Sequence, residues 1–212
     1  MEPLYPLGTY ALTALEMLAT AAFALSGIIA AARTRMDIVG VCVAAFVTAF
    51  GGGTLRDLLL DQRPFFWVRE QYVLAGVLAL SLIALRFMRL RHLSITERTI
   101  QWPDAIGLGL FCASGVHAAH LAGMPPLVCL IMGVVTSVFG GVLRDLICNE
   151  VPETLRNHQP YAVCAFVGGA LYLVAEALSA PDWLAIAACA LLTFLLRALA
   201  ILRNWSLPAW RA

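Results

Sequence analysis

The sequence predicts an all-α integral membrane protein whose seven transmembrane helices form two inverted three-helix repeats and one additional helix. Three observations lead to this prediction. The 212 residues are 61% hydrophobic and only 13% charged, whereas soluble domains carry about 25% charged residues. The mean hydropathy is +0.85, and apolar segments near the length of about 20 residues that spans a bilayer follow one another along the chain. The third observation is an internal repeat.

The repeat aligns residues 16–64 with residues 104–152 at a constant separation of 88 residues, without gaps. Of these 49 positions, 15 are identical, and Glu16 aligns with Asp104. The motif Gly-Gly-x-Leu-Arg-Asp occurs at residues 52–57 and again at residues 140–145. Internal repeats of this kind indicate two copies of one structural unit.

The apolar segments predict spans in the following order. We expect them near residues 10–32, 37–60, 71–85, 104–121, 126–148, 161–178 and 181–201. In a single membrane domain over residues 1–212, repeat one then covers 8–85, a cytoplasmic loop covers 86–103, repeat two covers 104–178, and the seventh helix covers 181–203. The residues before the first segment contain one charged side chain, Glu2, and no basic side chain. We therefore expect a membrane span there and not a cleaved signal peptide.

The arginines predict the orientation of the chain in the membrane. The chain contains no lysine, and most of its arginines fall in loops on one side of the predicted spans: Arg33, Arg35, Arg86, Arg89, Arg91, Arg98, Arg156, Arg203 and Arg211. Arg63 and Arg69 fall on the other side. Because cytoplasmic loops carry the arginine excess, we expect the N-terminus outside and the C-terminus inside. Three spans per repeat then turn the second copy upside down relative to the first.

Several classes of function are disfavoured by the composition and the motifs. The formal net charge of +1 gives no support for nucleic-acid binding. No phosphate-binding loop or catalytic constellation is recognisable, so we expect neither an enzyme nor a cofactor. His117 and His120 lack further ligands at metal-binding spacing, so we expect no metal site. The six cysteines occur singly in apolar segments, which is typical of small buried hydrophobic residues.

The glycines are expected to break the second and fifth helices, at residues 51–53 and 140–141. Unwound backbone carbonyls at Gly51, Gly52, Gly53, Gly140 and Gly141 would suit a partly dehydrated monovalent cation. The alternative is that the glycines only permit two helices to cross closely.

Hydroxyl groups close to the glycines could also line a pore. Thr48, Thr136 and Ser137 are candidates, although helical hydroxyls also commonly form hydrogen bonds within or between helices. Ser26 and Ser114 each precede a glycine, and we expect these two serines mainly to permit close approach of the first and fourth helices.

Five charged residues form the second group of candidates: Arg56, Asp57, Arg144, Asp145 and Glu16. Ionisable groups inside a membrane usually face a cavity or each other. One interpretation is that each arginine pairs with an aspartate, either within its own repeat or across the repeats, and locks the broken helices. The other is that the aspartates attract cations while the arginines gate the path. Glu16 lies inside the first span and could face a cavity or the membrane interface. We expect Asp104, its repeat equivalent at the start of the fourth span, to be solvated at the interface, where an acid near a helix N-terminus is favourable.

Together these motifs resemble the bacterial members of the TRIC (trimeric intracellular cation channel) family. The resemblance rests on Gly51–Asp57 in the second span and Gly140–Asp145 in the fifth, and it extends over about residues 8–203. It implies a homotrimer in the bacterial inner membrane. Each protomer would contain its own pore for monovalent cations, K⁺ foremost, bent at the glycines and lined by the first, second, fourth and fifth helices.

The function expected from the sequence is therefore passive conduction of monovalent cations across the lipid bilayer. Bacterial relatives of this family have also been proposed to carry glycine, so a transporter for a small zwitterion is the first alternative. A membrane scaffold without transport activity is the second, and it would require the glycines to be packed without any path between them.

Overall fold

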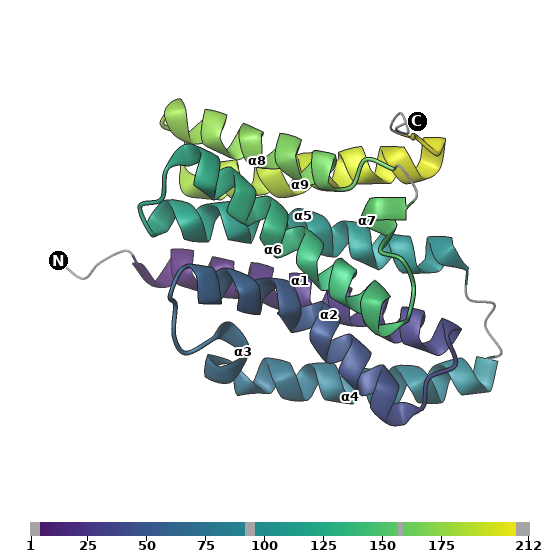
Figure 1. Ribbon diagram of the computed structural model, residues 1–212. Coiled ribbons are helices and arrows are strands. Elements are labelled where there is room, and N and C mark those ends of the chain that lie inside the picture. The colour runs from purple at the N-terminus through teal and green to yellow at the C-terminus, as the bar shows by residue number, and fades with distance from the viewer. Residues whose placement is uncertain (1–4, 92–95, 157–158, 207–212) are drawn as a thin grey trace.

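The computed structural model describes residues 5–91, 96–156 and 159–206, and all regular structure in these ranges is helical (Figure 1). Seven helices are long: α1 Tyr5–Arg33, α2 Ile38–Leu59, α4 Gln71–Arg91, α5 Glu97–Leu121, α6 Pro126–Ile147, α8 Ala162–Ala177 and α9 Asp182–Arg203. Two are single turns, α3 Phe66–Arg69 and α7 Glu153–Arg156. Each of the seven predicted segments lies on one of the long helices.

Four of the described helices are long and apolar enough to cross a membrane. They are α1 (from Leu12), α2, α6 and α9, with mean hydropathies of 1.8, 2.0, 2.2 and 2.4. Shorter apolar segments occur in α4 and α8. α5 contains charged residues in its first turns, and its long middle section is largely buried by the other helices.

The predicted cytoplasmic loop over residues 86–103 is wrong in its extent. α4 continues to Arg91, and α5 begins at Glu97 after a capping box formed by Thr96 and Thr99. Pro103 therefore lies inside α5, where the proline lacks the N–H group that the helix would use. Polar residues mark where a span leaves the membrane, but they do not end a helix. Residues 92–95, the side chains of Arg89, Arg91 and Arg156, and all of Arg211 lie outside the described parts of the chain.

The expected breaks in the second and fifth helices are also wrong. α2 runs from Ile38 to Leu59 and α6 from Pro126 to Ile147 without interruption. A glycine costs a helix about 1 kcal/mol relative to alanine, whereas an unpaired backbone group inside a membrane costs several kcal/mol. The helical hydrogen bonds therefore persist through the glycines. α2 nevertheless changes direction near its middle (Figure 1).

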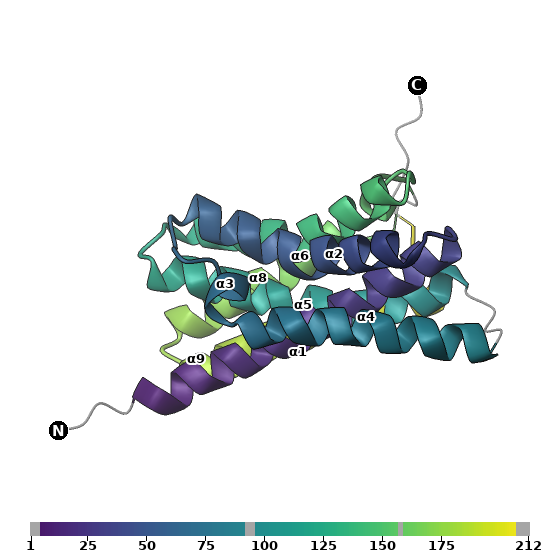
Figure 2. The same cartoon turned by 90° about the horizontal axis from the view of Figure 1, so that it is seen from below.

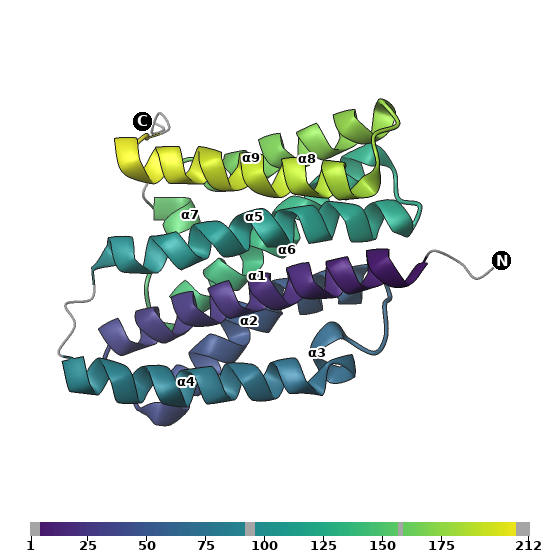
Figure 3. The same ribbon diagram turned by 180° about the vertical axis from the view of Figure 1, so that it is seen from behind.

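The two halves of the chain are arranged with opposite directions. In Figure 1, α1, α4 and α6 run from left to right, while their repeat equivalents α5, α8 and α2 run from right to left, and Figure 3 shows the same relation from behind. α1, α2, α5 and α6 pack against one another at the centre. In Figure 2, α2 and α6 lie together on one side of α1 and α5. α4 covers one edge of this central group, and α8 and α9 cover the other.

Each half has its own hydrophobic core. One core joins α1, α2 and α4 and includes Ile28, Val41 and Phe50. The other joins α5, α6, α8 and α9 and includes Leu108 and Tyr172. A small separate cluster of Ala19, Phe23 and Phe111 lies where α1 meets α5. The centre of the molecule is therefore a seam between two cores, and the candidate site lies along this seam.

Candidate functional site

The crossing of α2 and α6 is the closest approach between the two halves of the chain. A β-carbon added to Gly52 would lie 2.0 Å from the backbone oxygen of Thr136, and one added to Gly140 would lie 2.4 Å from the backbone oxygen of Thr48. No side chain fits at either position. These two glycines therefore match the second interpretation of the sequence, in which glycine permits a tight helix crossing.

The remaining glycines of the two motifs differ from one another. A β-carbon on Gly51 would meet the side chain of Leu143 at 2.6 Å, and one on Gly141 would lie 3.1 Å from the Tyr161 hydroxyl oxygen. A β-carbon on Gly53 would find no atom within 4 Å. Among the five glycines predicted to line a path, Gly53 is thus the one that faces open space.

The predicted pore hydroxyls are buried and satisfied within their own helices. Thr48, Thr136 and Ser137 donate to the backbone oxygen four residues earlier, at 2.6, 2.6 and 2.8 Å. All three side chains are fully buried. The structure thus shows the intrahelical hydrogen bonds that the sequence interpretation kept as the alternative to pore lining.

Arg56 is the centre of a buried charged cluster in the first half. Its guanidinium donates from Nε and Nη2 to Asp57 Oδ1 at 2.8 and 2.7 Å, and from Nη1 to Glu16 and to Ser114 Oγ. Ser114 Oγ donates to the same Glu16 oxygen at 2.7 Å. The second oxygen of Asp57 accepts a hydrogen bond from the Phe66 backbone N–H at 3.0 Å. We call this group the outer cluster, after the predicted orientation.

Arg144 is the centre of an equivalent group in the second half, the inner cluster. Its Nε donates to Asp145 Oδ1 at 2.8 Å, and its Nη1 donates to Asp104 and to Ser26 Oγ. Asp145 Oδ2 accepts from the Glu153 backbone N–H at 2.9 Å. Asp104 is completely buried, so the prediction that left it solvated at the interface is wrong.

The two clusters are related by the repeat, with the serines exchanged. Each arginine pairs with the aspartate that follows it and with the acid of its own half, but its serine partner comes from the other half. The geometry therefore matches the locking interpretation of the charged pairs, although the aspartates do not cross between the repeats. Each arginine faces two carboxylates, so each cluster has a formal charge of −1.

A further arginine extends the inner cluster and was missed by the sequence interpretation. Arg197 of α9 is fully buried and donates to Glu153 Oε1 at 2.8 Å and to Gln159 Oε1 at 3.0 Å. Its guanidinium carbon lies 4.9 Å from the centre of the Tyr161 ring. The available signal was an arginine within an otherwise apolar segment, which inside a membrane indicates a buried partner. Arg197 and Glu153 balance each other and leave the formal charge of the inner cluster at −1.

Two cavities adjoin the outer cluster. The larger has a volume of about 170 Å³ and is lined on α1, α2, the α2–α3 segment and α5 by Leu12, Thr13, Glu16, Arg56, Gln62, Arg69, Ser114, His117, Ala118 and Leu121. The smaller has a volume of about 10 Å³ and lies beside Gly53 and Phe111. Glu16 and Arg56 line both cavities, so the outer cluster separates them. The Glu16 side chain keeps 13% of its surface exposed.

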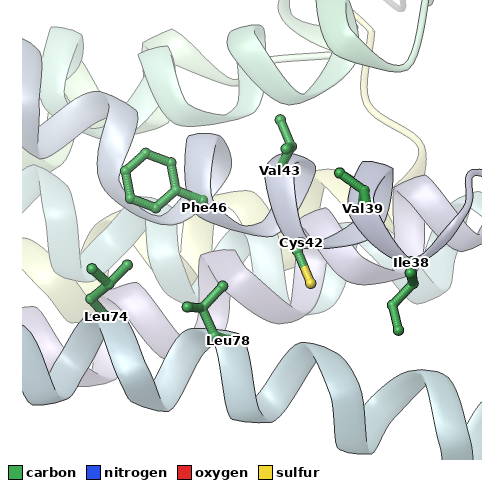
Figure 4. A pocket seen from close by; sticks show the side chains of 7 residues that line it. All are labelled: Ile38, Val39, Cys42, Val43, Phe46, Leu74 and Leu78. Atoms are coloured by element: carbon green, nitrogen blue, oxygen red, sulfur yellow. The ribbon is translucent and has the colours of Figure 1, made fainter.

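A wide groove between α2 and α4 is of a different kind. Its volume is about 420 Å³, and Figure 4 shows its lining: Ile38, Val39, Cys42, Val43, Phe46, Leu74 and Leu78. No charged or hydroxyl side chain occurs among these residues. The groove therefore lacks the polar groups that could select an ion or a polar solute.

The sequence model of the family described as "Glycine transporter" matches this chain twice, over residues 13–89 and residues 101–177. The chain belongs to the Glycine transporter family. The two matches of this family begin 88 residues apart, which is the separation of the internal repeat. Each half of this Glycine transporter family member thus corresponds to one copy of the same unit.

Curated relatives of the chain are membrane proteins of the UPF0126 group. The "UPF0126 inner membrane protein YadS" of Escherichia coli (strain K12) is 36% identical over 197 residues, which cover 92% of this chain and 94% of that protein. A UPF0126 membrane protein of Deinococcus radiodurans is 41% identical over 163 residues, covering 76% and 75%. This Glycine transporter family member is a multi-pass protein of the bacterial inner membrane, the membrane named for YadS.

Solved structures of TRIC channels share the fold. The TRIC trimeric intracellular cation channel orthologue from Rhodobacter sphaeroides superposes with a TM-score of 0.85 at 35% identity, covering 92% of this chain and 99% of that chain. A second structure, described under "Structural basis for conductance through TRIC cation channels", superposes with a TM-score of 0.83 at 35% identity, covering 93% and 96%. The resemblance to TRIC channels seen in the sequence motifs is confirmed. These relationships favour a membrane transport protein.

Proposed function

We propose that the protein is a channel that conducts monovalent cations, K⁺ foremost, along the seam between its two halves. The observation that carries this proposal is the pair of buried clusters, each with one more carboxylate than guanidinium. A fixed negative charge in a site of low dielectric constant attracts cations and repels anions. Two such charges related by the repeat would favour cations entering from either side of the membrane.

The cavities indicate the course of the outer half of the path. A cation would enter the cavity of about 170 Å³ beside Arg69 and Gln62, pass Glu16, and reach the small cavity at Gly53. Phe111 lines this small cavity and packs against Phe23. Because two phenyl rings cannot replace the hydration shell of a cation, we place the gate of the channel at this pair.

The proposal includes the assembly and topology expected from the sequence. All seven long helices would span the inner membrane, with the N-terminus outside and the C-terminus inside, and the two repeats of three helices would have inverted topology. Three copies would form a homotrimer, because the Rhodobacter sphaeroides TRIC orthologue with this fold is a trimeric channel. In this arrangement each protomer would contain its own path.

Flux measurements on the purified protein in proteoliposomes test the proposal. We expect K⁺ efflux that dissipates an imposed voltage, and a lower preference for K⁺ over Cl⁻ in the double variant Glu16→Gln, Asp104→Asn. The matched control is Glu176→Gln, because the Glu176 carboxylate pairs with His120 outside both clusters and outside the lining of both cavities. Absence of voltage-driven K⁺ flux through folded protein would contradict the proposal, as would unchanged ion preference in the double variant.

A second candidate function is passage of a small zwitterion, as the name of the family suggests. The larger cavity favours it, because its lining contains both a carboxylate, Glu16, and a guanidinium, Arg69. Its volume of about 170 Å³ corresponds to five or six water molecules, at about 30 Å³ each. That space suits a molecule with as few heavy atoms as glycine.

Uptake of labelled glycine in the same vesicles separates the two functions. Saturable uptake that is competed by unlabelled glycine and lost in Arg69→Gln, without voltage-driven K⁺ flux, would make the protein a carrier. Voltage-driven K⁺ flux without saturable glycine uptake would make it a channel.

A further inference from the structure

The small cavity beside Gly53 has the size of one water molecule. Its volume is about 10 Å³, and a cavity needs about 10–15 Å³ to hold one water molecule. K⁺ and water have nearly the same radius. The absence of any atom within 4 Å of a β-carbon on Gly53 contributes to this space.

Three oxygen-bearing side chains line the cavity. Thr20 is 1% exposed, and its hydroxyl oxygen has no hydrogen-bond partner within the described parts of the chain. The Thr54 hydroxyl accepts a hydrogen bond from Trp67 Nε1 at 3.1 Å, and Glu16 contributes the carboxylate of the outer cluster. A buried hydroxyl without a hydrogen-bond partner destabilises the folded protein, so the unpartnered Thr20 oxygen indicates a missing ligand.

The second half of the molecule shows what the cavity lacks. The repeat equivalent of Gly53 is Gly141, and there the Tyr161 hydroxyl oxygen occupies the neighbouring space, 3.1 Å from a β-carbon on Gly141. The repeat equivalents of the two threonines are Leu108 and Val142. The first half therefore places hydroxyl groups around an open space, whereas the second half has aliphatic side chains and a tyrosine that fills it.

We infer that this cavity is a binding site for one partly dehydrated monovalent cation, coordinated by oxygens of Glu16, Thr20 and Thr54. Carboxylate and hydroxyl oxygens can replace the hydration shell of K⁺ or Rb⁺, and the formal charge of −1 on the outer cluster favours a cation over a neutral water. The rings of Phe111 and Trp67 complete the lining of the cavity. The inference rests on the proposed conduction of cations. It places the first site at which a cation loses part of its hydration shell in the outer half of the path only.

The site can be tested without measuring flux. Crystals of the full-length protein grown in Rb⁺ are examined by anomalous diffraction, and the thermal stability of the detergent-solubilised protein is titrated with Rb⁺. We expect an anomalous peak between α1 and α2 beside Gly53, together with saturable stabilisation. Thr20→Val should weaken Rb⁺ binding about tenfold or more, because one of the three coordinating oxygens is lost.

Thr193→Val is the matched control. Thr193 is also a fully buried threonine whose hydroxyl lacks a hydrogen-bond partner among the described residues, but it lies on α9 against Gly168. The Thr193→Val variant should leave the anomalous Rb⁺ peak and the stabilisation by Rb⁺ unchanged. Thr54→Val provides a second variant, since valine is the residue at its repeat equivalent, and we expect it also to weaken binding.

The possible outcomes separate this inference from the proposed function. If vesicles pass K⁺ but the crystals contain only a water beside Gly53, the site is refuted and conduction stands. If the Rb⁺ peak is present and Thr20→Val removes it while vesicles pass no K⁺, the site is supported and conduction is refuted. Equal loss of Rb⁺ stabilisation in Thr20→Val and Thr193→Val would also overturn the assignment.

Discussion

The Phe23 and Phe111 rings meet at the seam between the two halves, with their centres 5.2 Å apart and their planes inclined by 48°. They are repeat equivalents, 88 residues apart. Phe23 also lies 3.0 Å from the position of a β-carbon on Gly140 and fills the space beside Gly107. A single aromatic pair therefore occupies the place where the two halves of a path would join.

Removing one ring should open this junction. We expect Phe111→Ala to increase K⁺ leak through proteoliposomes and to lower stability by about 3–5 kcal/mol, because a large buried side chain is lost. Ile28→Ala serves as the control, since Ile28 is also fully buried but lies in the core of the first half and lines neither cavity. Lower stability with unchanged leak in Phe111→Ala would remove the gate from this position.

The exchanged serines should contribute to the stability of both clusters. Ser26→Ala and Ser114→Ala each remove a hydrogen bond to a guanidinium, which contributes about 1.5–3 kcal/mol. Ser81→Ala is the control, because the buried Ser81 hydroxyl donates only to the Val77 backbone oxygen of its own helix. Thermal unfolding in detergent measures the difference, and equal melting temperatures for all three variants would show that the exchange adds no stability.

The glycines of the first motif should respond differently to alanine. Gly52→Ala places a β-carbon 2.0 Å from a backbone oxygen of α6, so we expect α2 and α6 to separate and the yield of folded protein to fall. Gly53→Ala meets no atom within 4 Å, and it should gain about 1 kcal/mol of helix stability. Size-exclusion profiles and melting temperatures of the two variants provide the comparison. A stable, monodisperse Gly52→Ala protein would contradict the close crossing.

Arg197 should stabilise the protein by pairing with Glu153, and its charge alone should add no stability. Arg197→Met leaves the partly buried Glu153 carboxylate without its guanidinium partner, although Gln101 still donates a hydrogen bond to it. Breaking the ion pair should therefore cost up to about 3–5 kcal/mol. Adding Glu153→Gln should restore part of this loss, since the unpaired charge is then gone. Arg203→Met, at an exposed position further along α9, should have little effect. If the double variant lowers the melting temperature by the sum of the two single changes, the pairing is contradicted.

The sequence was sufficient to locate the helices, the repeat and the charged motifs, because these depend on local composition and on self-similarity. It could not establish whether the glycines break the helices. That outcome depends on what lies opposite Gly52 and Gly140, and their neighbours, Thr136 and Thr48, come from the other half of the chain. The small local cost of glycine was visible in the sequence, but the larger cost of an unpaired backbone group in that tight crossing was not.

The same reason explains which site residues were missed. Ser26 and Ser114 each precede a glycine, so close helix packing was the natural interpretation, yet each serine binds an arginine of the opposite half. Thr20 has no repeat equivalent with a hydroxyl and did not attract attention. Its importance comes from an absence of partners, among the described residues, that becomes visible only when the surrounding helices are in place.

The exchange of serines has a consequence for the order of events during synthesis. Arg56 leaves the ribosome 58 residues before Ser114, whereas Arg144 leaves 118 residues after Ser26. The first three long helices therefore enter the membrane with an arginine that still lacks one partner, and only the arrival of α5 supplies it. When α6 follows, its arginine meets a serine that is already in the membrane. The second half of the chain thus completes the outer cluster, and the nascent protein passes through a stage in which Arg56 still lacks Ser114.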